Sequence, residues 1–291
     1  MRRILVSIMI VVAVPTAARA SSPQADPSSS QQAEPSSGKQ VNPSSGWIVA
    51  CSFSHRAKND PIVHPNMPGM SHSHDFFGNN STNAHSTLSS LLGKSTSCSL
   101  RSDTAAYWVP TLYKHGHKVR PTKATIYYRT QIDGGAAVHA FPPGLKMIAG
   151  DQDAKHRQSL KIVYYNCHEG PDQHRAASPY NCGSHTIDAH IRFPQCWDGA
   201  HRDSKNHQRH MAYPVYNHGM RTCPASHPVV LPRLIIRVSW PITNGRHVRL
   251  ASGRPYTLHA DYFDAWVHSA QQHLVAHCID AGRNCGKQIG R

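Results

Sequence analysis

Two histidines separated by one residue open the densest group of reactive side chains, in the segment MSHSHDFFG at residues 70–78. In an extended segment His72 and His74 point to the same side, about 6.5 Å apart along the chain, because side chains alternate. Such a pair can share a metal ion, or a proton and a substrate hydroxyl, and Asp75 adds a carboxylate. The chain holds 23 histidines, so this spacing also arises by chance.

A second group lies near the C-terminus, where HADYFDAW occupies residues 259–266. In a strand, His259 and Asp261 share one face. A histidine beside a carboxylate gives either a general base with a fixed tautomer or two ligands for a hard or borderline metal. We interpret Asp264 as the cap of a following helix and Trp266 as core packing on that helix.

A third group follows the segment PQCWDG at residues 194–199. Asp198 precedes a glycine, as turn residues do, and it is equally a candidate acid held rigidly at a cleft. The stretch that follows contains His207 and His210. We expect His210 to face inward, because it enters an apolar segment.

Three aromatic residues are candidate sugar-binding surfaces: Trp108, Trp197 and Tyr213. Core packing is the alternative for Trp108 and Tyr213, because the segments around them are apolar.

The cysteines argue for disulfides and against thiol catalysis. All eight follow residue 47, and an even count in an exported chain favours pairing. Sequence proximity predicts the pairs Cys51–Cys98, Cys167–Cys182, Cys196–Cys223 and Cys278–Cys285. No cysteine is then left over as a nucleophile. GxSxG, HExxH and P-loop motifs are also absent from the sequence, which leaves serine hydrolases, zincins and NTPases without support.

The first 46 residues predict export. Two arginines, an apolar run at residues 4–14 and a small-x-small site ending at Ala20 are typical of a signal peptide at residues 1–20. Residues 21–46 are rich in Ser, Pro and Gln and predict a disordered linker. We expect residues 47–291 to form one disulfide-bonded extracellular domain, secreted, monomeric and without a transmembrane segment.

The charge of the mature chain indicates an anionic partner. Without Arg2, Arg3 and Arg19 the chain has 28 Lys and Arg residues against 16 Asp and Glu, a net charge of +12. The basic residues are scattered singly and no nucleic-acid motif is present, so we expect no nucleic-acid partner. An extracellular polysaccharide or an anionic wall polymer fits better, and general solubility is the alternative explanation.

Short segments rich in β-branched and aromatic residues predict a mainly β protein. They lie at residues 105–113, 124–131, 161–166, 186–193, 233–240 and 256–262. The Gly-, Pro- and Asn-rich sequence between them suits an antiparallel β-sandwich or jelly-roll-like single domain with long loops. One C-terminal helix is expected at residues 264–278, with its apolar face against the sheet.

Seven ordered blocks carry a resemblance to a known family. They are MSHSHDFFGN, AAYWVPTLY, FPPGLKMIAGD, FPQCWDG, NHQRHMAYP, CPASHPVVLP and LASGRPYTLHADYFDAW. Over residues 47–280 the chain resembles a secreted family of actinomycetes and filamentous fungi, catalogued as domain of unknown function nineteen ninety-six. The resemblance implies a single extracellular domain and supplies no reaction. The family pattern falls on His72, His74, Asp75, Trp108, Pro110, Cys196, Trp197, Asp198, Gly199, His210, Tyr213, His227, His259, Asp261 and Trp266.

With that resemblance, we expect the two histidine groups to meet at one site. Polar groups are costly to bury unpaired, so His72, His74 and Asp75 should converge with His259 and Asp261. Asp198 or His210 is expected to complete the site.

Two functions from different classes follow. The first is a secreted enzyme that acts on an extracellular polysaccharide or cell-wall polymer by hydrolysis or elimination. Hydrolysis would pair Asp198 with Asp261, whereas elimination would use His74 or His259 as the base. The second is a non-catalytic glycan- or wall-binding module with a structural His/Asp network. The sequence establishes no cofactor, and a divalent metal would be held by His72, His74, His259 and Asp261.

Overall fold

The computed structural model describes residues 42, 44–169 and 174–287. The expected signal peptide at residues 1–20 lies outside the described residues, as does most of the expected linker at residues 21–46. The described residues belong to one compact unit. Its first strand, β1 (Gly46–Ala57), begins one residue before the expected start of the domain.

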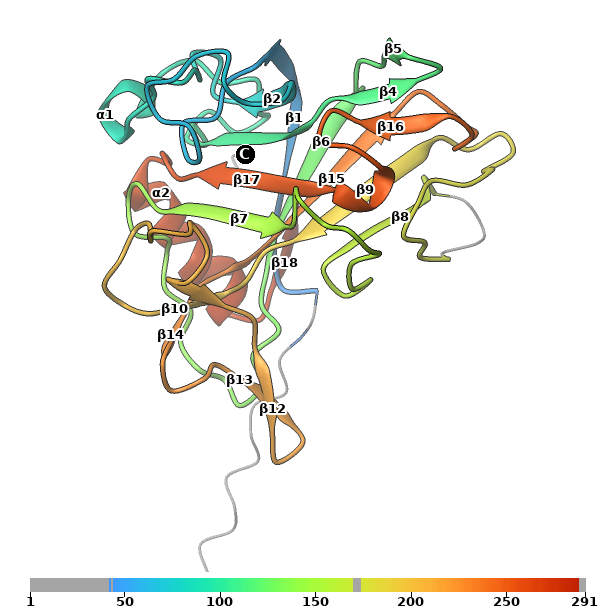
Figure 1. The fold of residues 1–291 in the computed structure, drawn as a ribbon. Coiled ribbons are helices and arrows are strands. Elements are labelled where there is room, and N and C mark those ends of the chain that lie inside the picture. Colours follow the sequence, from blue (N-terminus) through green and yellow to red (C-terminus); the bar gives the residue numbers. More distant parts are fainter. Residues whose placement is uncertain (1–41, 43, 170–173, 288–291) are drawn as a thin grey trace, which may run out of the picture. The chain divides into compact units, whose positions relative to one another are not determined.

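One large, mainly antiparallel sheet forms the fold (Figure 1). The sheet coils because the two halves of its longest strand pair with different neighbours. The first half of β1 pairs with β6 (Lys123–Arg129), and the second half pairs with β2 (His74–Gly78), with a register shift between Phe53 and His55. The strand order is β7 (Lys146–Gly150), β17 (His259–Phe263), β3 (Ala106–Pro110), β2, β1, β6, β15 (Arg233–Trp240), β9 (Ile187–Arg192) and β8 (Val163–Cys167).

The two ends of this order come back toward each other, since β7 at one end contacts β9 near the other. The predicted mainly β, antiparallel, sandwich-like fold is therefore confirmed, and its sheet lies between a sandwich and a barrel in form. The short strand β18 (Asn284–Gly286) also belongs to this sheet and pairs with β1 in parallel. Smaller elements decorate the sheet: β4 (Leu112–Lys114), β5 (His117–Lys118), β10 (Cys196–Trp197), β11 (Met211–Ala212), β12 (Val215–Asn217), β13 (Met220–Thr222), β14 (Val229–Val230), β16 (Val248–Leu250), the short helix α1 (Leu88–Leu91) and the 3-10 turn η1 (Pro255–Thr257).

The C-terminal helix is present but begins later than predicted. It consists of α2 (His268–Leu274) continued by the π-helical turn η2 (Val275–Asp280), and its N-cap is Val267. The assignment of Asp264 as the cap is wrong. Its carboxylate is buried and accepts a hydrogen bond from the Tyr262 hydroxyl at 2.6 Å. Local preference places an aspartate at the start of a helix, but tertiary packing buries Asp264 before the helix begins. No helix among the described residues is long and apolar enough to cross a membrane.

The two faces of the coiled sheet bury different apolar clusters. The larger cluster fills the inside, where Trp47 stacks on Tyr128 with ring centroids 4.6 Å apart. Trp266 meets Tyr128 edge to face, so its predicted core role is confirmed. A smaller cluster on the opposite face of β2, β3 and β17 includes Phe76 and Trp108. The four predicted disulfides are all present, and no described cysteine is free.

Candidate metal centre

Strand register brings the two predicted histidine groups together. In β2, His74 lies opposite Pro110 of β3, and in β17 Asp261 lies opposite Trp108 of the same strand. Because β17 and β3 are antiparallel, His259, two residues before Asp261, falls at the level of Pro110, two residues after Trp108. The histidines of β2 and β17 therefore flank one proline on the middle strand. Their ring centroids are 5.8 Å apart.

His72 completes a cluster of three imidazoles from the segment that leads into β2. Its ring centroid lies 4.2 Å from that of His74, and its Nε2 lies 3.2 Å from Nε2 of His259. One nitrogen of each ring lies within 4.8 Å of the other two. A tetrahedral ion with metal–nitrogen bonds of about 2.0–2.1 Å places its ligands about 3.3 Å apart, so the His72–His259 spacing already matches such a site.

Backbone carbonyls fix the tautomers of two of these histidines. Nδ1–H of His74 donates to the carbonyl of Asn59 at 3.0 Å, and Nδ1–H of His259 donates to the carbonyl of Thr257 at 2.9 Å. Each ring therefore presents an Nε2 lone pair to the cluster. Nε2 of His74 is buried without a hydrogen-bond partner among the described residues. This arrangement, with the outer nitrogen on a carbonyl and the inner one facing the other imidazoles, is the usual one for metal-binding histidines.

Two buried carboxylates adjoin the imidazoles. Ligand atoms of Asp60, His74 and Asp261 lie within 4.8 Å of one another. Oδ1 of Asp60 accepts from two backbone N–H groups, those of Ile62 and Val63, at 2.9 Å each. Oδ2 of Asp261 is buried and finds no partner in the described part of the chain.

Burial controls the protonation of the cluster. Desolvation lowers the pKa of His72 to about 3 and that of His259 to about 4, and it lowers the pKa of His74 well below 6.5. It raises the pKa of Asp60, and it raises that of Asp261 further, with the nearby Asp60 charge as a second cause. At neutral pH the imidazoles are neutral, as metal ligands must be. Three imidazoles suit a borderline cation such as zinc, and the Asp261 carboxylate next to His74 is a candidate further ligand.

Two open pockets reach the cluster. A pocket of about 260 Å³ is lined by His259, Asp261 and His207, and a second of about 390 Å³ is lined by His72 with the cations Lys58 and Arg249. The cluster thus contributes to the walls of both pockets, although His74 itself is fully buried.

His207 is a candidate proton acceptor at the rim of the smaller pocket. Its Nδ1 lies 2.9 Å from Oδ1 of Asp203, and its side chain is 25% exposed. If Nδ1–H donates to this carboxylate, Nε2 is left as a base with a fixed tautomer.

Asp75 does not join the cluster, so its predicted membership is wrong. It alternates with His74 on β2 and therefore points to the other face of the sheet. There it forms a buried ion pair with Arg56, with Nη2 and Oδ2 3.0 Å apart, and accepts from the Thr111 hydroxyl at 3.0 Å. These contacts tie β1, β2 and the end of β3 together, which is a structural role.

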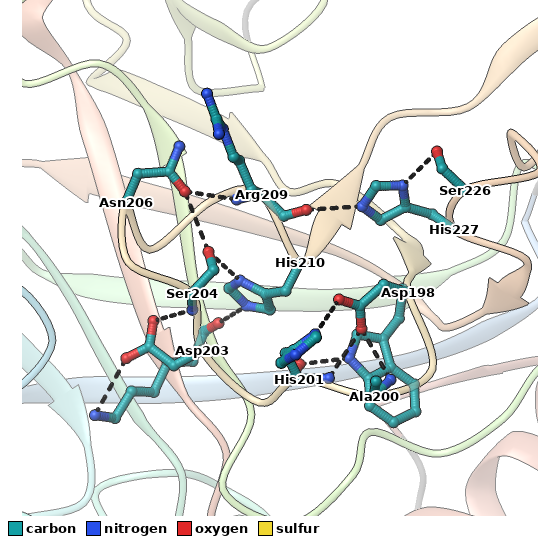
Figure 2. A network of polar contacts seen from close by, with 12 residues as sticks. Asp198, Ala200, His201, Asp203, Ser204, Asn206, Arg209, His210, Ser226 and His227 are labelled. Atoms are coloured by element: carbon teal, nitrogen blue, oxygen red, sulfur yellow. Dashed lines mark hydrogen bonds and ion pairs between the residues drawn. The ribbon is translucent and has the colours of Figure 1, made fainter.

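Asp198 and His210 belong to a separate polar network (Figure 2). Asp198 accepts from the backbone N–H groups of Ala200 and His201 at 2.9 Å each, which is the turn role considered from sequence. His210 is buried as expected, but its ring contacts the Lys146 carbonyl at 2.6 Å and the Ser204 hydroxyl at 3.0 Å. The structure therefore does not bring either residue to the histidine cluster as predicted.

The aromatic candidates divide by exposure. Trp108 is fully buried in the smaller apolar cluster, so its predicted role as a sugar platform is wrong. Trp197 donates its indole N–H to the His201 carbonyl at 2.6 Å. Tyr213 is 37% exposed and lines a pocket of about 330 Å³ that shares Gln208 with the pocket beside Asp261. Substrate contacts by Trp197 and Tyr213 remain predictions.

Sequence reasoning missed two residues of the site. Asp60 precedes a proline and is typical of a turn, so no local signal marks it as a ligand. His207 lies in a stretch whose secondary structure the sequence does not define, although its spacing from Asp203, four residues earlier, is a usable signal.

Comparison with known proteins gives one match. Residues 60–266 match the family described as Domain of unknown function (DUF1996). No curated protein and no solved structure matches the chain. The matched segment covers more than half of the sequence and contains every ligand candidate from Asp60 to Asp261, so the protein belongs to the DUF1996 family.

Proposed function

We propose that the protein is a secreted, divalent-metal-dependent enzyme that cleaves an acidic extracellular polysaccharide or wall polymer, by elimination in preference to hydrolysis. The observation that carries the proposal is a cluster of three neutral imidazoles beside two open pockets, with the Asp261 carboxylate, whose Oδ2 has no partner among the described residues, next to His74. Four disulfides support the extracellular setting.

The cationic pocket supports an acidic substrate. Lys58 and Arg249 line the same pocket as His72, so an acidic group on one unit of the polymer would enter a positive environment next to the cluster. The smaller pocket, lined by His259, Asp261 and His207, would receive the reacting unit, and a cation bound by the cluster would supply a Lewis acid that neutralises the carboxylate of that unit.

Elimination needs a neutralised carboxylate and one base. The proton on the carbon next to the carboxylate passes to Nε2 of His207, the C–O bond at the following carbon breaks, a carbon–carbon double bond forms, and the departing oxygen takes a proton from solvent. The Asp203 carboxylate, 2.9 Å from Nδ1, holds the His207 ring in a fixed orientation. In this arrangement His207, and not His74 or His259, is the base.

Hydrolysis by paired carboxylates has less support. The predicted partner of Asp261, Asp198, is engaged in its own turn. Asp60 and Asp261 are close to one another, but both are buried, at 3% and 1% exposure, so a sugar ring cannot lie between them.

A binding module with a structural ion is the second candidate function. It is favoured by the burial of His74 and His259, which are 0% and 2% exposed. An ion held so deeply could serve the fold alone.

One assay separates these outcomes. The purified secreted chain would be analysed for bound metal and then incubated with acidic and neutral polysaccharides, before and after chelation and metal return. Elimination yields both unsaturated products, read by their absorbance, and new reducing ends. Hydrolysis yields reducing ends only. Metal-dependent melting with no product from any polymer would reject the enzyme and favour the binding module.

A further inference from the structure

Four arginines gather on the solvent-side face of β6, β15 and β9, in the other half of the sheet. Arg129 of β6 lies directly opposite Arg233 of β15, and Arg192 of β9 pairs with Ile235, two residues further along β15. Arg237 follows on the same face of β15, because side chains alternate. Leu234, Ile236 and Val238 face the core in between.

Arg233 at the centre of this face has no counter-charge. Its guanidinium makes no hydrogen bond or ion pair with the described residues, and its Nε is buried without a partner. The Nε atoms of Arg192 and Arg237 are likewise buried and unpaired by hydrogen bonds. Desolvation, and then the charges of Arg192, Arg221 and Arg129, lower the pKa of Arg233 to about 9. Crowded cations of this kind are costly for the fold alone.

The nearby carboxylates pair with other basic side chains. Asp188 lies 2.7 Å from Nδ1 of His168 and 3.7 Å from Nε of Arg237, and Asp133 pairs with Arg221 at 3.3 Å. Neither carboxylate is paired with Arg233. The central guanidinium therefore keeps its donors for an anion from outside the described chain.

The tyrosines on this face are covered by arginines. Arg192 lies 5.0 Å from the ring centre of Tyr164, and Arg237 lies 5.6 Å from that of Tyr127. Stacking holds the guanidiniums in place, and it leaves these rings poor platforms for nucleic-acid bases. The face thus offers positioned charge and planar donors, which match carboxylate and sulfate groups.

We propose that this arginine face, centred on Arg233 and flanked by Arg129 and Arg192, binds the acidic groups of an anionic polysaccharide at a site separate from the histidine cluster. This binding site goes beyond the proposed reaction, because the arginine face would hold a polymer chain whether or not the histidine cluster binds a metal or cleaves the chain. Carboxylate and sulfate polymers share the required chemistry.

The test compares Arg233→Gln with Arg101→Gln, an exposed arginine before β3 that carries the same charge. Affinity would be measured for heparin as a sulfated polymer, polygalacturonate as a carboxylated polymer, and duplex DNA. Arg233→Gln should weaken polysaccharide binding about tenfold, the scale of one charge-assisted hydrogen bond, and Arg101→Gln less than about twofold. The better-bound polymer identifies the acidic group.

Two further readouts keep the proposal open to refutation. Arg233→Gln should melt at the wild-type temperature or above, because it removes a crowded charge, and chelation should leave polymer binding unchanged. Equal losses in the two variants, or a large drop in melting temperature for Arg233→Gln, would overturn the proposal. DNA binding as tight as polysaccharide binding, with the same loss in Arg233→Gln, would overturn the polysaccharide assignment.

Discussion

Replacing His74 with asparagine separates its structural and metal-binding roles. The asparagine side-chain amide lies near the position of Nδ1, so it can still donate to the Asn59 carbonyl that His74 contacts at 3.0 Å. It has no atom at the position of Nε2, the buried nitrogen without a partner. His74→Asn therefore deletes the ligand and keeps the hydrogen bond, whereas alanine would delete both.

The structural role and the metal-binding role predict changes of different size in the free energy of unfolding. The smaller side chain leaves part of a cavity and should cost about 1–2 kcal/mol, below the 2–5 kcal/mol of a full truncation to alanine. Metal at about 100 times its dissociation constant adds about 2.7 kcal/mol to the stability of a protein that binds it. For a domain of this size, about 2–4 °C of melting temperature per kcal/mol gives a rise of about 5–11 °C. We expect that rise in the wild type and none in His74→Asn.

Melting curves of chelated and zinc-loaded protein, with bound metal measured by mass spectrometry, check the expectation. The chain contains 23 histidines, so adventitious binding needs a control. His277→Asn provides it, because His277 stacks with His273 on the exposed side of the C-terminal helix, a typical chance metal site. If zinc stabilises His74→Asn as much as His277→Asn, or fails to stabilise the wild type, the metal centre is refuted.

Three further expectations concern other parts of the chain. His207→Gln should lower turnover by about 10²–10⁴-fold with bound metal unchanged, measured by initial rates and metal analysis; parallel loss of metal would argue against its role as the base. Removing the Cys51–Cys98 bridge, with a sequence separation of 47, should cost about 4 kcal/mol of unfolding free energy, and removing Cys278–Cys285, with a separation of 7, about 2.5 kcal/mol, in urea titrations of double serine variants. Equal costs would contradict the loop-entropy argument. Burial lowers the pKa of His190 from 6.5 to about 3, so the stability linked to its neutral form is complete above pH 6.5 and falls by about 2 kcal/mol at pH 5. In urea titrations at both pH values His190→Gln should lose less stability than the wild type, and equal losses would show that other groups govern the acid sensitivity.

Local alternation in the sequence predicted the correct faces of the two histidine groups. His72 and His74 lie on one side, and His259 and Asp261 lie on one face of β17. The same alternation places Asp75 on the opposite face from His74 and so excludes it from the cluster. The error arises from treating His72, His74 and Asp75 as one motif. The pairing of β2 and β17 with a shared neighbour, β3, is a contact across nearly 200 residues and has no local signature.

The strand predictions show a similar limit. The segment at residues 233–240 matches β15 because it is rich in β-branched residues and lies between two other strands of the sheet. The segment at residues 256–262 begins as a strand only at His259, since Pro255–Thr257 forms a 3-10 turn. That turn positions the carbonyl that fixes the His259 tautomer. The polar strands β1 and β2 were missed, because their histidines, serines and aspartate mask the apolar pattern.

The surroundings of the cluster explain why these polar groups point to a ligand. The smaller apolar cluster, with Phe76, Trp108 and Phe263, lies on the same face of the sheet as His74 and Asp261. In such an apolar setting, an unpartnered imidazole nitrogen and an unpartnered carboxylate oxygen each lower the stability of the fold, and apolar packing does not offset this cost. A cation bound between His74 and Asp261, as proposed, would satisfy both side chains and offset the desolvation of Asp261. The arginine face also holds buried groups without partners among the described residues, but these groups are positively charged, and an anionic polymer would pair with them.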